Sequence, residues 1–209
     1  MAVNLTDKFE RALQYATIIH GGQRRKHSDV PYMAHLLGVA SIALEYGADE
    51  TEAIAAVLHD AVEEAGGTDR LADILMRFGE TVAEIVDGCT DTKAQPKPPW
   101  RARKAAYIAH LPHATASVRL VSAADKLYNA RLLLKDLRLN GNGAWNQTKG
   151  GKEGTLWYLR CLVQAYKTAG INPLVEEFER AVVEIELMSK LLESEETQAM
   201  EGQSAEAGN

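Results

Sequence analysis

A short polar cluster inside an apolar stretch is the first place in this sequence where chemistry could occur. Residues 52–65 show near-helical spacing of apolar side chains and contain neither Pro nor Gly, which predicts a helix. On that helix His59 shares a face with Glu63, and Asp60 shares a face with Glu64. Imidazole and carboxylate groups can bind a metal ion or transfer protons, although Glu pairs more often form a solvated helix edge. One turn cannot enclose a cation, so a metal site needs ligands from other helices.

Two residues elsewhere in the chain could complete such a site. A helix predicted to begin near residue 31 carries His35 in its first turns, close to an apolar stripe. Asp125 interrupts the apolar pattern of a long helix further along the chain. Burying a carboxylate without a partner is costly. A cation held jointly by His35, His59, Asp60 and Asp125 would supply that partner.

Other polar residues suit a charged ligand. Asn129 lies one turn after Asp125 on the same face, where its amide could contact a phosphate or a hydroxyl group. Five cations with no acid among them follow Asp91, and these are Lys93, Lys97, Arg101, Arg103 and Lys104. Cations at the start of a helix oppose the helix dipole, so anion binding is a fair alternative to a solvated surface. Arg101 and Lys104 are therefore candidate phosphate clamps.

The elements that must position these residues are all predicted to be helices. No alternating strand pattern is apparent, and two polar segments, 91–99 and 141–154, are predicted loops. The expected fold is an all-α, single-domain bundle of about 8–10 helices. The clearest helical patterns cover residues 7–20, 31–44, 52–65, 68–78, 80–89, 118–131, 153–169 and 172–192.

Composition narrows the class of protein. The net charge is −6, but residues 193–209 contain five acids and no base, so the remainder carries −6 − (−5) = −1. This gives no basic excess for nucleic-acid binding. We find no apolar run that could span a membrane and no signal-peptide pattern, and therefore expect a cytoplasmic protein. Cys89 and Cys161 are too far apart in sequence to indicate a disulfide framework. We expect one domain over residues 1–192 and a disordered acidic tail over residues 193–209.

Four ordered motifs resemble those of a known family. The spaced pattern of His35, His59-Asp60 and Asp125 is similar to that of the HD-domain metal phosphohydrolases. The longer motifs resemble the hydrolase half of the RelA/SpoT homologues, and most of all the stand-alone small alarmone hydrolases. The resemblance extends from about residue 5 to residue 170. Its motifs are Arg25-Lys26, Pro31-Tyr32-Met33-Ala34-His35, His59-Asp60 with Glu63-Glu64, and the segment from Ala124 to Arg131.

The resemblance implies a metal centre and a pair of catalytic acids. In these enzymes two His and two Asp residues bind one divalent cation, usually Mn²⁺, which implies that role for His35, His59, Asp60 and Asp125. Mixed imidazole and carboxylate ligands suit Mn²⁺ or Fe²⁺ and do not exclude Zn²⁺. The acidic pair that follows positions and deprotonates the attacking water, which implies Glu63 and Glu64 here. The usual pair is Glu-Asp, so Glu64 departs from the family pattern by one methylene.

The same resemblance implies contacts with a nucleotide. Arg25 and Lys26 are similar to residues that stack on a purine and contact phosphate, and Asn129 would also contact the nucleotide. A tyrosine on the helix predicted over residues 153–169 reaches the substrate in related hydrolases. Tyr158 is the better match for it, with Trp157 as the alternative.

The expected activity is metal-dependent hydrolysis of the 3′-pyrophosphate of ppGpp and pppGpp, a step of the stringent response. One alternative is an HD phosphohydrolase that acts on adenosine alarmones, NADPH or deoxynucleotides. The other is a catalytically inactive module that senses nucleotides. The expected partner is in each case a small nucleotide, with no nucleic acid and no membrane, and the sequence leaves the oligomeric state open.

Overall fold

The structure is a computed structural model that describes residues 3–26, 28–94 and 96–207. Within those ranges it is all-α, as predicted, and has no strand beyond an isolated bridge between Arg24 and Pro31. The helices are α1 Asp7–Ile19, α2 Met33–Glu45, α3 Glu50–Leu58, α4 Ala61–Ala65, α5 Gly67–Phe78, α6 Glu80–Cys89, α7 Trp100–His110, α8 Ala116–Asn140, α9 Gly151–Ala169 and α10 Pro173–Ala207. Two 3₁₀ helices, η1 Leu111–His113 and η2 Gly141–Gln147, flank α8.

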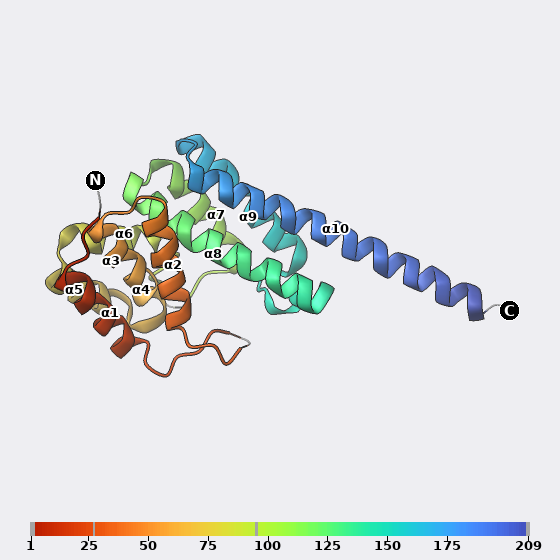
Figure 1. The fold of residues 1–209 in the computed structure, drawn as a ribbon, viewed down its shortest axis with the longest axis horizontal. Helices are drawn as coiled ribbons and strands as arrows, with labels where there is room; N and C mark the ends of the chain where they lie inside the picture. Colours follow the sequence, from red (N-terminus) through yellow and green to blue (C-terminus); the bar gives the residue numbers. More distant parts are fainter. Residues whose placement is uncertain (1–2, 27, 95, 208–209) are drawn as a thin grey trace.

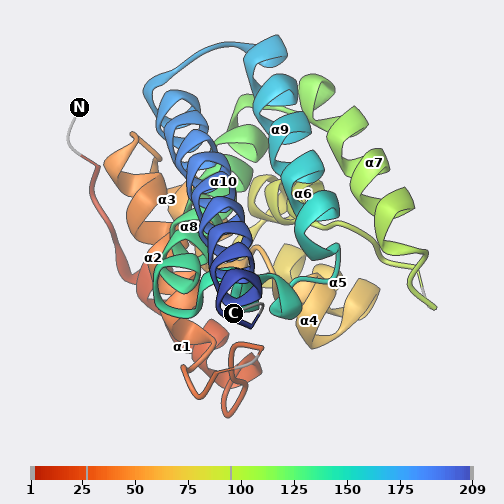
Figure 2. The same ribbon diagram turned by 90° about the vertical axis from the view of Figure 1, so that its right-hand side faces the viewer.

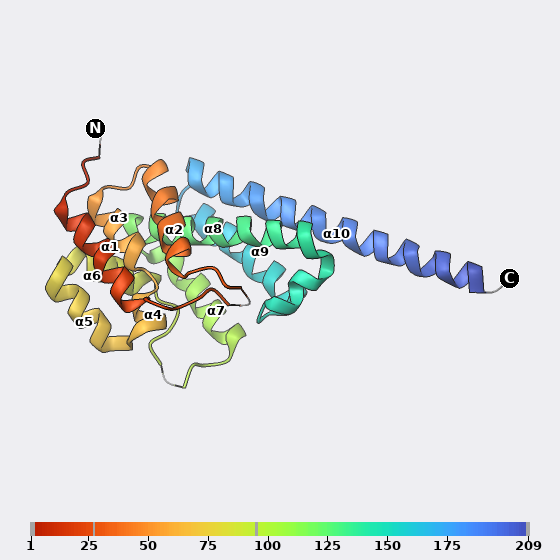
Figure 3. The same ribbon diagram turned by 60° about the horizontal axis from the view of Figure 1, so that its bottom comes forward.

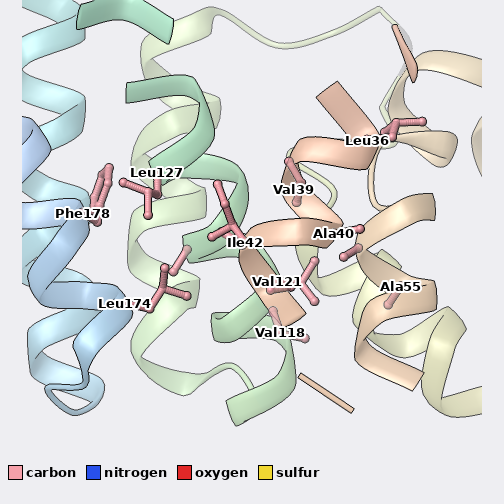
Figure 4. Packing of buried hydrophobic residues seen from close by; sticks show 14 of the residues in the cluster. Leu36, Val39, Ala40, Ile42, Ala55, Val118, Val121, Leu127, Leu174 and Phe178 are labelled. Carbon is pink, nitrogen blue, oxygen red and sulfur yellow. The ribbon is translucent and has the colours of Figure 1, made fainter. Parts of the chain in front are cut away.

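Helix α8 forms the centre of the bundle. It packs against α2, α3 and α6 on one side and against α10 on the other (Figures 1 and 2). Figure 4 shows apolar side chains of α2 and α10 meeting those of α8 from opposite sides. Thr115 caps the start of α8 by accepting a hydrogen bond from the backbone nitrogen of Val118. The packing of α8 against α2 and α3 determines which of its residues face these two helices.

A glycine allows α2 to approach α8 closely. A Cβ atom added at Gly38 would lie 2.2 Å from Cε2 of Tyr128 on α8, which is too close for any other residue without a shift. The Tyr128 ring in turn packs edge-on against His35, with 5.0 Å between ring centroids. The approach of the two helices therefore places His35 of α2 next to α8.

The helix predicted over residues 52–65 is wrong in one respect, because the chain turns between α3 and α4. The Nδ1 atom of His59 lies 2.8 Å from the carbonyl oxygen of Ala56, which a continuous helix would use for a backbone bond. Side-chain bonds to nearby backbone groups compete with helix formation in this way. As a result His59 and Asp60 sit at a bend, and Glu63 and Glu64 begin a new short helix.

Two other predicted boundaries need correction. Residues 141–147 form η2 rather than a flexible loop, because Trp145 is buried there and η2 packs against α8 and α10. The end predicted near Leu192 for the last helix is too early, since α10 continues to Ala207 and extends beyond the other helices (Figure 1). The domain boundary at residue 192 and the disorder of residues 193–209 stay predictions. Among the described helices, none combines the length and the apolar composition needed to cross a membrane.

Candidate functional site

Four side chains from three parts of the chain meet at one point. The Nε2 atoms of His35 and His59 are 3.2 Å apart. Oδ2 of Asp60 lies 3.2 Å and 3.3 Å from these two nitrogens, and Oδ1 of Asp125 lies 3.4 Å and 3.7 Å from them. Both imidazoles and Asp125 are buried, while Asp60 is partly open to solvent. The structure therefore brings together all four residues that the sequence singled out as ligands.

The donor atoms of this cluster fit a metal ion. Because Nδ1 of His59 donates to the Ala56 carbonyl, a neutral His59 presents the lone pair of Nε2 to the cluster. The Asp60 carboxylate accepts a hydrogen bond from the Tyr32 hydroxyl at 2.5 Å. Asn129 donates to Oδ1 of Asp125 at 2.6 Å. Each of these contacts orients a ligand from outside, which is typical of metal sites.

The charges in the cluster call for a cation. Burial would raise the pKa of both carboxyls, but His59 and His35 hold the pKa of Asp60 below its usual range, and Lys126 and the same imidazoles do so for Asp125. Burial alone would lower the pKa of His59, yet the carboxylates of Asp60 and Asp125 raise it to about 10. The pKa of His35 is lowered by burial. The two carboxylates therefore attract positive charge to the cluster, which either a proton on His59 or a divalent cation in its place can supply.

Helix α4 places both acids of the predicted catalytic pair at the edge of this cluster. Glu63 Oε1 lies 2.9 Å from Nζ of Lys97. Glu64 Oε1 lies 3.8 Å from Nζ of Lys26. Both carboxylates line a polar cavity of about 240 Å³ together with His35, Asp60 and Asp125. The cavity thus holds ligand candidates and proton acceptors side by side.

Cationic and hydrogen-bonding groups complete the wall of this catalytic cavity. The predicted residues Arg25, Lys26, Asn129, Lys104 and Tyr158 all line it. Arg25 donates to the side-chain oxygen of Asn129 at 3.0 Å, so Asn129 bridges Arg25 and Asp125. The Tyr158 hydroxyl is buried and makes no hydrogen bond to any described group.

Two of the predicted contacts are not brought into the cavity. Arg101 is exposed and stacks over the Trp157 ring, with its Cζ atom 3.3 Å from the ring centroid. Neither residue lines the catalytic cavity or the larger groove next to it. Of the two candidate aromatics, Tyr158 therefore faces the site and Trp157 does not.

The sequence analysis missed several residues of the cavity. Lys126 binds Asp125 at 2.5 Å and lies over the Tyr107 ring. Its signal was available, because a lysine next to an acid within an apolar helix needs a buried partner. Asp91, which follows α6, also lines the cavity and forms a buried ion pair with Arg103 of α7, which does not line it. No local spacing marks this pair, because it depends on how the loop folds back.

Comparisons with known proteins agree with this geometry. A family model described as "HD domain" matches residues 12–143. The guanosine-3′,5′-bis(diphosphate) 3′-pyrophosphohydrolase MESH1 of Xenopus tropicalis is 38% identical over 141 residues, which are 66% of this chain and 74% of that protein. The human MESH1 protein is 39% identical over 124 residues, covering 57% of this chain and 66% of that protein.

A solved structure is similar over most of the chain. It is described as a metazoan ortholog of SpoT that hydrolyzes ppGpp, with a TM-score of 0.70 and 29% identity. The alignment covers 86% of this chain and 96% of that structure. The matching HD model and the cluster of His35, His59 and Asp125 together indicate a divalent metal site. With more than half of its length matched by the HD model and most of its bundle shared with this structure, the chain belongs to the HD-domain family.

Proposed function

We propose that this protein removes the 3′-pyrophosphate from guanosine 3′,5′-bis(diphosphate) and from the corresponding pentaphosphate, giving GDP or GTP and pyrophosphate. The single observation that carries the proposal is the meeting of His35, His59, Asp60 and Asp125 beside Glu63 and Glu64 in one polar cavity. The names of the MESH1 relatives support the substrate, and so does the activity of the similar SpoT ortholog.

The four-residue cluster would hold one divalent cation, and we propose Mn²⁺. Two imidazole nitrogens and two carboxylates suit Mn²⁺ or Fe²⁺, with Zn²⁺ as a further possibility. When bound, such an ion would lower the pKa of coordinated water well below that of bulk water, so that the water is easier to deprotonate. Tyr32, Asn129 and Lys126 keep the carboxylate ligands in place through the hydrogen bonds described above.

Glu63 and Glu64 would orient the attacking water and take its proton. The water oxygen attacks the phosphorus that is bonded to the ribose 3′ oxygen, and the bond between this phosphorus and the 3′ oxygen breaks. The 3′ oxygen takes up the proton that the glutamate removed from the water and leaves as a hydroxyl. Glu63 is held by Lys97 at 2.9 Å, whereas Glu64 has Lys26 at the longer distance of 3.8 Å. Positioned carboxylates of this kind supply general-base catalysis.

The cationic wall would bind the phosphates and the base. Lys26, Lys104 and Lys126 line the catalytic cavity and can neutralise charge that develops on the departing pyrophosphate. The planar guanidinium of Arg25 can stack on a purine, since arginine readily packs against aromatic rings. Tyr158 offers its hydroxyl, which lacks a partner among the described residues.

A substrate panel tests the proposal. The purified protein is incubated with ppGpp, pppGpp, ppApp, NADPH and dGTP, with Mn²⁺ and after removal of metal. We expect metal-dependent release of pyrophosphate and GDP from ppGpp. Turnover of ppApp, NADPH or dGTP alone would show that the proposed substrate is wrong, while the protein would still be a phosphohydrolase. Nucleotide binding without any turnover would overturn the proposal in favour of a sensing module.

A further inference from the structure

A second cavity continues from the catalytic cavity. This base groove, as we call it, has a volume of about 560 Å³ and runs beside α8 toward η2 and the start of α9. The two cavities share several wall residues, namely Arg25, Lys26, Tyr32, Lys104, Lys126, Asn129 and Tyr158. A ligand bound at the metal cluster can therefore extend directly into the base groove.

One face of α8 connects the two cavities. Apart from the adjacent Leu132 and Leu133, the wall residues on that face follow at spacings of three or four, and they are Asp125, Asn129, Leu132, Leu133, Asp136 and Asn140. Asp136 lies eleven residues after Asp125, which is three turns and roughly 16 Å along the helix axis. The face thus runs from a metal-ligand candidate, past a hydrogen-bonding amide and two leucines, to a second carboxylate.

Asp136 differs from every other acid in the two cavities. Asp60 accepts from Tyr32, Asp125 accepts from Lys126, and the remaining three, Glu63, Glu64 and Asp91, each lie next to a lysine or arginine. Asp136 is half-buried in the wall of the base groove, and no described residue pairs with it by a hydrogen bond or an ion pair. A partly buried carboxylate without a hydrogen-bond partner destabilises the folded protein, and a ligand that donates to it removes this cost.

We propose that Asp136 recognises the guanine base and selects it over adenine. The inference rests on the proposed function, which places the scissile 3′ phosphate at the metal cluster and the base further along α8. The Watson–Crick edge of guanine presents two neighbouring donors, N1–H and the exocyclic amine, and both can donate to one carboxylate. Adenine instead presents the N1 lone pair at the position of the first donor, which the carboxylate repels. A charged acceptor facing a missing donor discriminates strongly.

The test compares Asp136→Asn with the unaltered protein on three substrates. These are the 3′,5′-bis(diphosphates) of guanosine, inosine and adenosine, assayed with Mn²⁺. We expect Asp136→Asn to lower kcat/KM for the guanosine substrate by about 10- to 100-fold, mainly through KM. The adenosine substrate should improve, because an asparagine amide can donate to adenine N1 and accept from its amine. The unaltered protein should prefer guanosine over inosine, which lacks the amine, and the variant should lose that preference.

Asp69→Asn is the matched control, because Asp69 is exposed on α5 and lines neither cavity. It should leave all three substrates unchanged, and both variants should keep their melting temperature and metal content. Guanosine, inosine and adenosine ratios that stay the same in Asp136→Asn would overturn the inference while leaving the proposed function intact. If no substrate is hydrolysed at all, the proposed function fails, and direct binding then decides on Asp136. In that case GDP should bind the unaltered protein more tightly than ADP. Asp136→Asn should remove this difference in affinity, and Asp69→Asn should keep it.

Discussion

Three of the four ligand candidates, His59, Asp60 and Asp125, are oriented by hydrogen bonds from outside the cluster, whereas Nδ1 of His35 has no hydrogen-bond partner among the described residues. The bond from His59 to the Ala56 carbonyl fixes the imidazole tautomer, and Lys126 and Asn129 fix the two oxygens of Asp125. Such outer contacts are what hold metal ligands in a productive geometry. The precision of the site therefore depends on residues that do not themselves touch the ion.

Asp125→Ala should abolish metal binding and turnover together. The change removes one carboxylate ligand and leaves Lys126 as a buried charge next to the cluster. Metal content of the purified variant, measured by mass spectrometry, should fall close to background. An active, metal-replete Asp125→Ala protein would contradict the ligand assignment, and Asp69→Asn should retain full metal content as the control.

Glu64→Gln separates catalysis from metal binding. The amide keeps the size of the side chain but cannot take a proton, so kcat should fall by roughly 100-fold or more. Metal content should stay unchanged, because Glu64 is not among the clustered ligand candidates. Unchanged kcat would remove Glu64 from the proposed mechanism and leave Glu63 as the base.

At the scale of residues, the sequence predicts which side chains come together where periodicity carries the information. His35 and Asp125 each lie beside an apolar stripe, so the need for a partner inside the core could be recognised from the sequence alone. Arg101 shows the limit, because its charge and position suggest a phosphate clamp while its side chain packs on Trp157 outside the cavity. Helix spacing predicts which way a residue points from the helix axis. Arg101 lies in the first turn of α7, where a long side chain can turn in several directions.

At the scale of elements, a buried ion pair fastens the segment between α6 and α7. Arg103 on α7 binds Asp91 at the beginning of this segment and donates from Nε to the carbonyl oxygen of Pro98 near its end. Figure 3 shows this segment as an extended loop outside the bundle. Arg103 also comes within 3.9 Å of Glu63. The pair therefore links the loop and α7 with Glu63, the candidate catalytic acid.

Arg103→Met should loosen that link. Removing one partner of a buried ion pair leaves Asp91 with Lys104 alone, and we expect the free energy of unfolding to fall by about 3 kcal/mol. Urea denaturation measures the change, and kcat should fall because Glu63 loses a neighbour. Arg103→Lys keeps the charge and should recover part of both losses. Equal stability of Arg103→Met and the unaltered protein would show that the pair does not hold the loop.

Gly38→Ala tests the close contact between α2 and α8. The added methyl would lie 2.2 Å from Tyr128, so the helices or the ring must shift, at a cost of about 1–3 kcal/mol. A shift of Tyr128 also disturbs His35, so metal affinity should fall together with the melting temperature. Gly143→Ala is the control, because nothing lies within 4 Å of its added methyl. Wild-type stability and metal affinity in Gly38→Ala would contradict this packing.

The sequence predicted that the elements are helices, but it predicted less well the residues at which they begin and end. The bend between α3 and α4 depends on one side-chain bond to the Ala56 carbonyl, which hydrophobic spacing does not reveal. The polar segment before α9 has the composition of a loop, but burial of Trp145 makes η2 part of the bundle. At the bend a local side-chain bond overrides a pattern that is correct on average, and at η2 a tertiary contact does so.

At the scale of the molecule, the two halves of α10 differ in how much they pack against the rest of the bundle. Its first half packs on α8, with Leu174, Phe178 and Ile185 buried, and its last part extends beyond the other helices (Figure 1). We propose that the folded domain ends at residue 192, as the sequence predicts. The ion pair between Lys152 and Glu193 lies at that boundary, on the surface.

A chain shortened to residues 1–192 should keep its fold and its activity. Surface ion pairs such as Lys152 with Glu193 contribute at most about 1 kcal/mol. Thermal melting and the rate of pyrophosphate release should both stay close to those of the full chain. A large drop in melting temperature would assign residues 193–209 to the folded domain, and hydrogen exchange along α10 would locate where protection ends.

The most direct test of the central claim is hydrolysis of ppGpp in ¹⁸O-labelled water with Mn²⁺, followed by mass analysis of both products. If the cluster and its acidic pair direct water onto the phosphorus at the 3′ oxygen, the label appears in pyrophosphate and GDP carries none. The reaction should stop after metal removal and in Asp125→Ala. Label in GDP, or release of single phosphates from either end, would contradict the account.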